Sequence, residues 1–157
     1  MVVRQYSRTM VCNENATQVM NAVENDFSRF GDYSIWGFEG VSFYLPSTMK
    51  AGSTIPIFDQ VNTPFFPVSR SLSVNVKSAN SQSLTFTTNP GHLLYPAHIT
   101  FSASSSSLGS VTFNIDLAGI VPAGLNSLEF RFGGGNFENA QWNHFLGNVE
   151  NFCKEGH

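Results

Sequence analysis

Apolar and polar residues alternate along five segments of the chain between residues 41 and 117. The apolar members of these segments are Val41, Phe43 and Leu45, then Leu72, Val74 and Val76, then Leu84 and Phe86, then Ile99, Phe101 and Ala103, and finally Val111, Phe113, Ile115 and Leu117. Alternation of this kind gives a strand one apolar and one polar face, so each segment predicts a half-buried strand. Loops of hairpin length separate the last four segments, which predicts an antiparallel meander.

The first thirty residues predict a strand followed by a helix. The strand covers residues 2–11, and the helix is expected to begin at Asn13 or Asn15, because an asparagine side chain accepts hydrogen bonds from the first turn. Gly31 is expected to end it. The apolar positions are Val3, Tyr6, Met10 and Val11 in the strand and Val19, Met20, Val23, Phe27 and Phe30 in the helix.

A second helix is predicted over residues 136–154, after glycine-containing links at 119–124 and 133–135. Its apolar residues recur at intervals of three and four and form one stripe. They are Trp142, Phe145, Leu146, Val149, Phe152 and Cys153, while Ala140, Gln141, His144, Gly147 and Asn148 form another face. The stripe must cover an apolar surface, and the sheet is the only large one that the pattern provides.

The composition agrees with one β-rich domain. A chain of 157 residues can bury a sizeable core, and we expect residues 1–154 to form a single domain, with 155–157 as the stub of a purification tag. Fifteen residues are Phe, whereas charged residues make up only 12%, against about 25% in an average protein. Polarity comes mainly from Ser, Thr and Asn, which suit strand surfaces and turns.

Charge and hydropathy exclude several classes of protein. The net charge is −3 and the basic residues are scattered, so nucleic-acid binding is not expected. No segment approaches the 18–20 apolar residues of a membrane span, and the first residues lack the apolar core of a signal peptide, which predicts a cytoplasmic location. Cys12 and Cys153 are both expected near helix ends. In a reducing compartment they are interpreted as buried free thiols, with a disulfide as the alternative.

The order of strand, helix, meander and long final helix resembles the helix-grip fold of the START and Bet v 1-like superfamily, and in particular its small polyketide cyclase/dehydrase-type members. The matching parts are the opening strand that leads into the helix at Asn13, the hairpin from Ala97 to Leu117, the turn from Gly119 to Gly124 and the helix from Asn136 to Lys154. The resemblance implies an α+β fold whose curved sheet wraps around the last helix. It also implies a cavity between the two that holds a small apolar molecule or cyclises a polyketide.

The residues offer little sign of metal or nucleophilic chemistry. The four histidines do not stand at ligand spacing, no Gly-x-Ser-x-Gly elbow occurs, and Gly133–Gly135 lacks the Lys and Ser/Thr of a phosphate-binding loop. We therefore expect no metal and no cofactor. Pairing Phe101 with Phe113 would place His98 opposite Asp116, and we predict these two as a structural pair on the polar face of the sheet.

Three functions fit the sequence. The first is a binding module for a small hydrophobic molecule, in a monomer or weak homodimer. Its predicted ligand-binding residues are Phe43, Phe58, Phe86, Tyr95, Phe101, Phe113, Trp142, Phe145 and Val149. The second is a cyclase, aromatase or dehydratase, which needs an ionisable or polar group aimed into the same pocket. Candidates are Asp59, Glu129, Arg131 and His144, together with the polar-tipped Tyr33, Trp36 and Tyr95. The third is a filled-core interaction domain that contacts a partner through the segment Pro64-Phe65-Phe66-Pro67, where two prolines exclude a central strand.

Overall fold

The computed structural model describes residues 2–35, 39–43, 49–62, 67–90, 96–107, 109–119 and 135–155. Within them, eight strands form one antiparallel sheet in the order β1-β8-β7-β6-β5-β4-β3-β2. The strands are β1 (Val2–Val11), β2 (Tyr33–Ile35), β3 (Glu39–Phe43), β4 (Thr54–Asn62), β5 (Pro67–Ala79), β6 (Ser83–Thr88), β7 (Ala97–Ser107) and β8 (Ser110–Gly119). The helices are α1 (Ala16–Asn25), α2 (Phe27–Gly31) and α4 (Gly135–Lys154).

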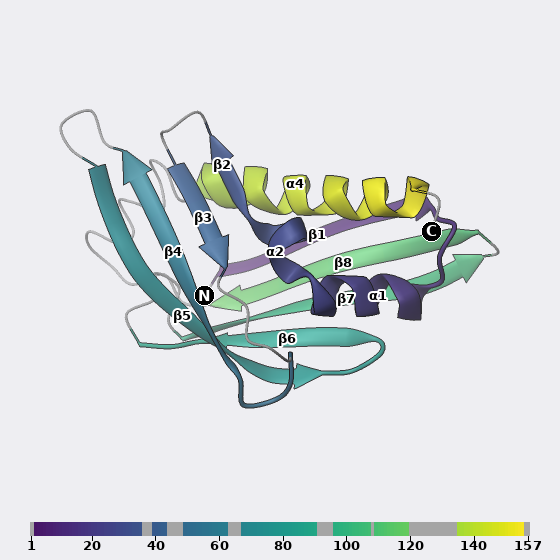
Figure 1. Ribbon diagram of the computed structural model, residues 1–157, viewed down its shortest axis with the longest axis horizontal. Coiled ribbons are helices and arrows are strands. Elements are labelled where there is room, and N and C mark those ends of the chain that lie inside the picture. Colours follow the sequence, from purple (N-terminus) through teal and green to yellow (C-terminus); the bar gives the residue numbers. More distant parts are fainter. Residues whose placement is uncertain are drawn as a thin grey trace.

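The sheet curls around the helices, which all lie on its concave side (Figure 1). The first strand, β1, pairs with the last strand, β8, and both strands contact α4. This arrangement is an α+β helix-grip fold, as the order of predicted elements indicated. Of the segment Pro64-Phe65-Phe66-Pro67, on which the interaction hypothesis rests, residues 64–66 lie outside the described residues, and Pro67 is the first residue of β5.

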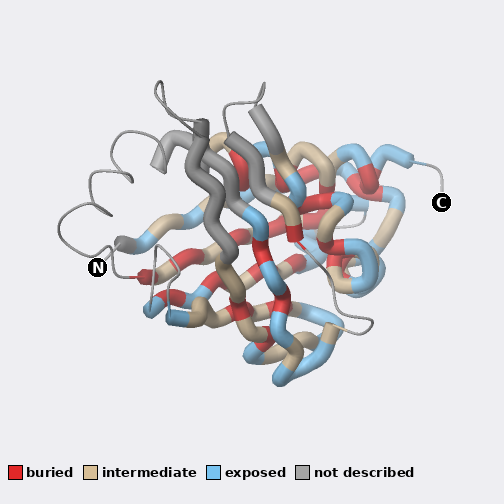
Figure 2. Tube along the Cα trace, turned by 60° about the vertical axis from the view of Figure 1, so that its left-hand side comes forward, coloured by how far each residue is buried: buried red, intermediate tan, exposed pale blue. Residues whose placement is uncertain are grey.

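The alternating pattern correctly identifies which side chains face inward. In β8 the four predicted apolar residues are all buried, and the polar residues between them are only half-buried. Figure 2 shows the same alternation of buried and more exposed positions along the strands. In β1 the pattern was misleading, because Val3 and Val11 are exposed and share the outer face, whereas Tyr6 and Met10 face inward.

The outer face of the sheet is covered by hydroxyl and amide groups that bond to one another across strands. Ser7 Oγ donates to Asn114 Oδ1 at 2.7 Å, and the hydroxyls of Thr9 and Thr112 lie 2.8 Å apart. Thr85 and Thr100 form a similar pair at 2.9 Å between β6 and β7. Such pairs stabilise neighbouring strands, and they account for the many Ser, Thr and Asn residues of the chain.

The predicted pairing of His98 with Asp116 is wrong by two residues. Phe101 pairs with Ile115 instead of Phe113, so Asp116 lies opposite Thr100 and His98 lies opposite Ala118. The strands continue into residues 105–109, whose serine-rich composition predicts the hairpin loop, and β7 shifts register between Ser105 and Ser107. Because a shift of two keeps every side chain on its face, both residues still lie on the polar side.

The predicted first helix is two helices. Asn15, not Asn13, caps α1: its side chain accepts the N–H of Gln18, whose side chain accepts the N–H of Asn15, each at 2.9 Å. This reciprocal arrangement satisfies two of the free donors at the helix start. The helix is interrupted at Asp26, whose backbone is not helical (φ −144°, ψ 50°), and α2 begins at Phe27.

The apolar stripe of α4 covers the concave face of the sheet as predicted, and all six of its members are buried. Two residues of the other predicted face hold the helix against α2. Gln141, which is buried, donates to the carbonyl of Gly31 at 3.5 Å, and Asn148 donates to the carbonyl of Phe30 at 3.0 Å. The two helices therefore bury one continuous apolar surface against the sheet.

Cys12 and Cys153 form a disulfide, so the expectation of free thiols is wrong. The bond joins the residue after β1 to the last turn of α4, across a sequence separation of 141 residues. The N–H of Asn13 also donates to the carbonyl of Cys153 at 3.1 Å. The two cysteines thus fix the C-terminal end of the helix to the edge of the sheet.

Two glycines provide a matched test of helix packing. An alanine Cβ at Gly147 in α4 would meet only Arg8 Nη1, at 3.8 Å, so we expect Gly147→Ala to stabilise the protein by about 1 kcal/mol through helix propensity. At Gly31 the same Cβ would lie 2.9 Å from Phe27 and 3.1 Å from Phe43, so Gly31→Ala should cost about 2 kcal/mol. Urea denaturation of both variants checks the opposite signs, and equal effects would contradict this packing.

Candidate functional site: the interior between sheet and helix

Seven of the nine predicted ligand-binding residues lie together in one apolar core. They are Phe43 of β3, Phe86 of β6, Phe101 of β7, Phe113 of β8, and Trp142, Phe145 and Val149 of α4. Phe58 does not belong to this set, because it is 38% exposed on the opposite face of β4 from the buried Ile55 and Ile57. Tyr95 lies outside the described residues.

The centre of this interior is filled by the ring of Phe27, a residue that was predicted for the helix stripe but not for the site. Its ring centroid lies 5.1 Å from that of Phe43, 5.2 Å from those of Phe86 and Phe101, and 5.5 Å from that of Phe145. Phe27 has no exposed surface. A molecule bound in the native interior therefore cannot occupy the middle of the ring cluster.

Several interior residues near the N-terminal half of α4 keep a small accessible surface, as Phe43, Ala103 and Phe152 do elsewhere in the core. Phe101, Phe113 and Phe145 are 0% exposed, whereas Ile99 and Leu117, cross-strand partners in β7 and β8, keep 7% and 6%. Trp142 keeps 8%, one turn before Phe145 in α4. Ala97, at 8%, continues the inward-facing row of β7 beyond Ile99. We call Ala97, Ile99, Leu117 and Trp142 the α4-end lining.

The indole nitrogen of Trp142 is a polar atom within this apolar region. Its ring packs against Phe101, with centroids 5.6 Å apart, and against Phe145 at 6.1 Å. The indole Nε1 is buried and makes no hydrogen bond with any residue that the structure describes. Buried donors almost always have a partner, so this atom requires an explanation.

The described residues place few of the acid–base candidates in the interior. His144 is exposed on α4, where its ring lies 4.7 Å from that of Tyr33, and His98 is exposed on the outer face. Asp59 belongs to β4, opposite Val41 of β3. Trp36, Glu129 and Arg131 lie outside the described residues. Among the residues whose burial the structure describes, Gln141 is the one polar or charged residue that is buried as a whole.

Among the described residues, two carboxyl groups have raised pKa values because of burial, and neither lies in the α4-end lining. Asp32 Oδ1 accepts the backbone N–H of Phe43 at 2.8 Å, which joins the end of α2 to β3 and partly offsets the burial that raises its pKa. Burial raises the pKa of Glu24 in α1 to about 7, against a smaller opposing effect of a backbone hydrogen bond from Asn80. One oxygen of Glu24 is buried without a hydrogen bond in the described structure.

Glu24 makes the stability depend on pH. In the folded protein its carboxyl group stays protonated up to about pH 7, whereas the ordinary value is 4.5. Its stabilising contribution is therefore complete below pH 4.5 and is lost as the pH rises to 7. We expect Glu24→Gln to be more stable than the native protein by about 1 kcal/mol at pH 8, since partial exposure reduces the full linkage effect, and equally stable at pH 4.

Urea denaturation at the two pH values measures this difference. Glu14→Gln is the matched control, because it removes the same charge just before α1 and should change the unfolding free energy by less than about 0.5 kcal/mol at either pH. If Glu24→Gln showed the same small, pH-independent effect as the control, the carboxyl group would not be buried as described.

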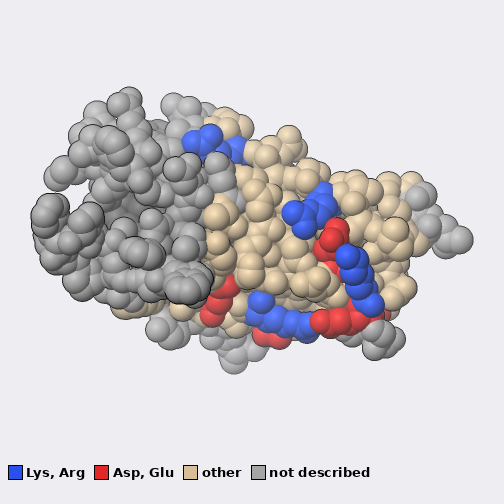
Figure 3. All heavy atoms as spheres, turned by 90° about the horizontal axis from the view of Figure 1, so that it is seen from above, with Lys and Arg blue, Asp and Glu red and all other residues tan. Residues whose placement is uncertain are grey.

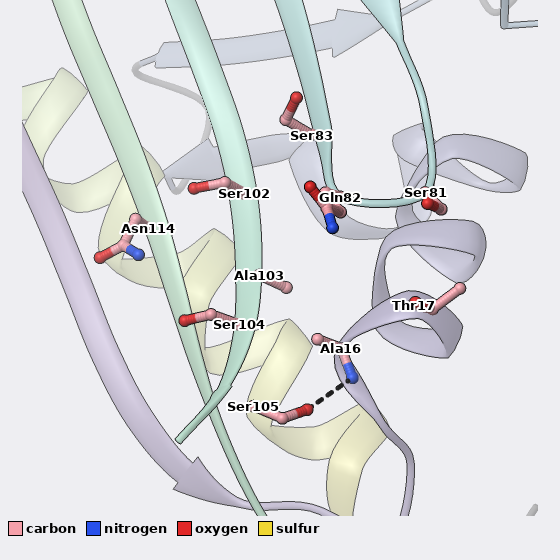
Figure 4. Close-up of a pocket in the computed structure, with 10 residues that line it drawn as sticks. All are labelled: Ala16, Thr17, Ser81, Gln82, Ser83, Ser102, Ala103, Ser104, Ser105 and Asn114. Carbon is pink, nitrogen blue, oxygen red and sulfur yellow. Dashed lines mark hydrogen bonds between the residues drawn. The ribbon is translucent and has the colours of Figure 1, made fainter.

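A hollow of about 560 Å³ lies where the start of α1 meets the β5–β6 turn and strand β7 (Figure 4). It is lined by Ala16, Thr17, Ser81, Gln82, Ser83, Ser102, Ala103, Ser104, Ser105 and Asn114. In Figure 4 Ala103 and Ser105 point toward α1, where Ser105 Oγ accepts the N–H of Ala16 at 3.2 Å, whereas Ser102 and Ser104 point to the other side of β7. The hollow is thus open, polar and shared between two faces of a strand, unlike the predicted apolar site.

Charged groups provide no alternative site in the described residues. Figure 3 shows basic and acidic side chains lying next to one another on one face, and two of the ion pairs join Arg29 to Glu155 at 2.8 Å and Lys154 to Glu150 at 3.4 Å. Among the residues that the structure describes, no group of three His, Cys, Asp or Glu residues could hold a metal ion. Of the helices that the structure describes, none is both long and apolar enough to cross a bilayer.

Comparison with known proteins supports the fold and gives no family. No protein-family model and no curated protein matches the sequence. Similar solved structures include protein CV1439 from Chromobacterium violaceum, with a TM-score of 0.65, 10% identity and 98% of both chains covered. The Aha1 dimer from Colwellia psychrerythraea gives a TM-score of 0.64 at 10% identity, covering 99% of this chain and 98% of that one. The KanY protein gives 0.61 at 12% identity, covering 99% and 100%.

Proposed function

We propose that this protein, as a single domain over residues 1–154, binds a small and mainly apolar molecule at the α4-end lining. The observation that carries the proposal is a buried indole N–H, that of Trp142, which has no partner in the described structure and lies in a residue that keeps a small accessible surface. Ile99, Leu117 and Trp142 retain 7%, 6% and 8% of their surface, whereas Phe27, Phe101 and Phe145 retain none. Pockets for small molecules are mostly apolar with a few well-placed polar groups, and this end of the interior has both features.

Binding is a better proposal than cyclisation of a polyketide. A cyclase needs a group that exchanges protons inside the pocket. The one histidine on α4, His144, is exposed, and its ring is tilted against that of Tyr33, with centroids 4.7 Å apart. The α4-end lining itself consists of aliphatic and aromatic side chains, which favour retention of an apolar molecule over its conversion.

The disulfide gives information about the cellular compartment in which the protein acts. Disulfides persist in oxidising surroundings and are rare in the reducing cytoplasm. The bond between Cys12 and Cys153 therefore counts against the cytoplasmic location expected from the N-terminal sequence. We propose that the protein acts where this bond stays oxidised.

A titration with the uncharged fluorescent probe N-phenyl-1-naphthylamine tests the proposed function. Saturable binding to the native protein is expected. Ala97→Leu fills the α4-end lining with an apolar side chain and should weaken the probe's binding about tenfold, because it removes the space that the probe occupies. Ala118→Leu, the same change on the outer face of the neighbouring strand β8, should leave binding unchanged.

Two results would contradict the proposal. One is the absence of saturable binding to the native protein, and the other is equal weakening by both variants. Native mass spectrometry of freshly purified protein gives a second measurement, in which a co-purified small molecule is expected to be lost in the Ala97→Leu variant and retained in Ala118→Leu.

A further inference from the structure

The indole of Trp142 is placed to bind the ligand as well as to pack. Its side chain is more than nine-tenths buried, yet its N–H group has no acceptor in the described structure. Tryptophan Nε1 is only a donor, so another donor cannot satisfy it. The rings nearest to it, Phe101 and Phe145, have no acceptor atoms.

The residue that carries this N–H keeps a small accessible surface, although the nitrogen itself is buried. Trp142 belongs to the α4-end lining, together with Ala97, Ile99 and Leu117, whose side chains are all hydrocarbon. An unpaired donor at a closed and fully packed site would be costly with nothing to offset it. At a binding site the same donor is paired when the ligand enters.

We infer that the ligand carries a carbonyl oxygen that accepts a hydrogen bond from Trp142 Nε1, on an otherwise apolar ring or chain. A carbonyl suits this lining better than a hydroxyl group, because a hydroxyl brings its own donor and the hydrocarbon side chains around it provide no acceptor. The inference rests on the proposed function and narrows it to apolar ketones, esters or related carbonyl compounds.

Two ligands of nearly the same shape separate the hydrogen bond from apolar burial. These are 2-acetylnaphthalene, which has a carbonyl oxygen, and 2-ethylnaphthalene, which lacks it. Equilibrium dialysis with absorbance detection gives the affinity of each for the native protein and for Trp142→Phe. Comparing the ratio of the two affinities between proteins cancels the different solubilities of the ligands in water.

The ratio of acetyl to ethyl affinity is expected to fall about fivefold to tenfold in Trp142→Phe, since one hydrogen bond is lost. Leu117→Ala is the control, because it alters the same lining without removing a polar atom. It should weaken both ligands by the same factor. Proton–nitrogen NMR of the native protein gives an independent readout. A variant is needed only to assign the two tryptophan indole signals of the chain. The Trp142 N–H signal should move strongly with 2-acetylnaphthalene and weakly with 2-ethylnaphthalene.

The outcomes distinguish this inference from the function on which it rests. If both compounds bind and the ratio is the same in Trp142→Phe, or if both shift the indole signal equally, the carbonyl inference is overturned while binding stands. If neither compound nor N-phenyl-1-naphthylamine binds the native protein, the proposed function fails and the inference fails with it.

Discussion

Replacing Phe27 with alanine is expected to lower the free energy of unfolding by about 4 kcal/mol, the largest effect of any single substitution proposed for this chain. The ring is completely buried and contacts four other rings from three strands and from α4. Its removal takes away its own burial and leaves a void that rigid neighbouring rings cannot close. Urea denaturation followed by circular dichroism measures the loss.

Phe58→Ala is the matched control for Phe27. It deletes the same kind of ring, but from the outer face of strand β4, where the side chain is 38% exposed, and not from α2 in the interior. We expect it to cost less than about 1 kcal/mol. Similar losses for the two variants would show that the α2 ring is not the centre of the core. The loss of unfolding free energy in Phe27→Leu should lie between those of the two alanine variants. This variant keeps the test informative if Phe27→Ala does not fold.

The sequence predicted the faces of strands better than their partners. Alternation depends only on the next few residues, and it correctly assigned the buried members of β6, β7 and β8. Register depends on where a turn begins, and the serine-rich end of β7 resembles a loop in composition. The turn instead occurs next to Gly109, whose φ of 76° suits glycine. The strands are therefore longer than predicted, and His98 lies opposite Ala118 and not opposite Asp116.

Two strands were not predicted, for identifiable reasons. The strand β2 has three residues, too few to show an alternation. In β4 the buried Ile55 and Ile57 do alternate with their neighbours, but Pro56 stands between them. A proline argues against a strand that has partners on both sides. In the described structure Pro56 pairs only with Ser73 of β5, because the pairing of β4 with β3 begins at Ile57, so the proline occupies a position with one partner strand.

The sequence predicted which residues line the candidate site but not how much space they leave between them. Phe101, Phe113 and Phe145 could be assigned to the interior because each lies on an apolar face of a strand or helix. How much space they leave depends on what enters from elsewhere. The break at Asp26 starts a second short helix and places Phe27 among these rings. No local pattern reveals such a fit, so the sequence could not tell that the middle of the interior is filled.

The second large effect is expected from the disulfide. Replacing both Cys12 and Cys153 with alanine should lower the free energy of unfolding by about 3 kcal/mol, because the bond closes a loop of well over one hundred residues in the unfolded chain. For a domain of this size the thermal midpoint should fall by about 10 °C. Scanning calorimetry of the oxidised protein and the double variant measures both quantities.

Reduction provides the control for the disulfide, because dithiothreitol should lower the midpoint of the native protein and leave that of the double-alanine variant unchanged. Cys153 lies eleven residues beyond Trp142 in α4, which is about 16 Å along a helix. The bond therefore fixes the end of α4 opposite the proposed ligand, and well below the midpoint the variant should bind N-phenyl-1-naphthylamine as the native protein does. Two reactive thiols in the unreduced native protein, or a midpoint that does not respond to reductant, would show that the cysteines are not bonded. Weaker probe binding by the folded variant would show instead that the two ends of the helix are coupled.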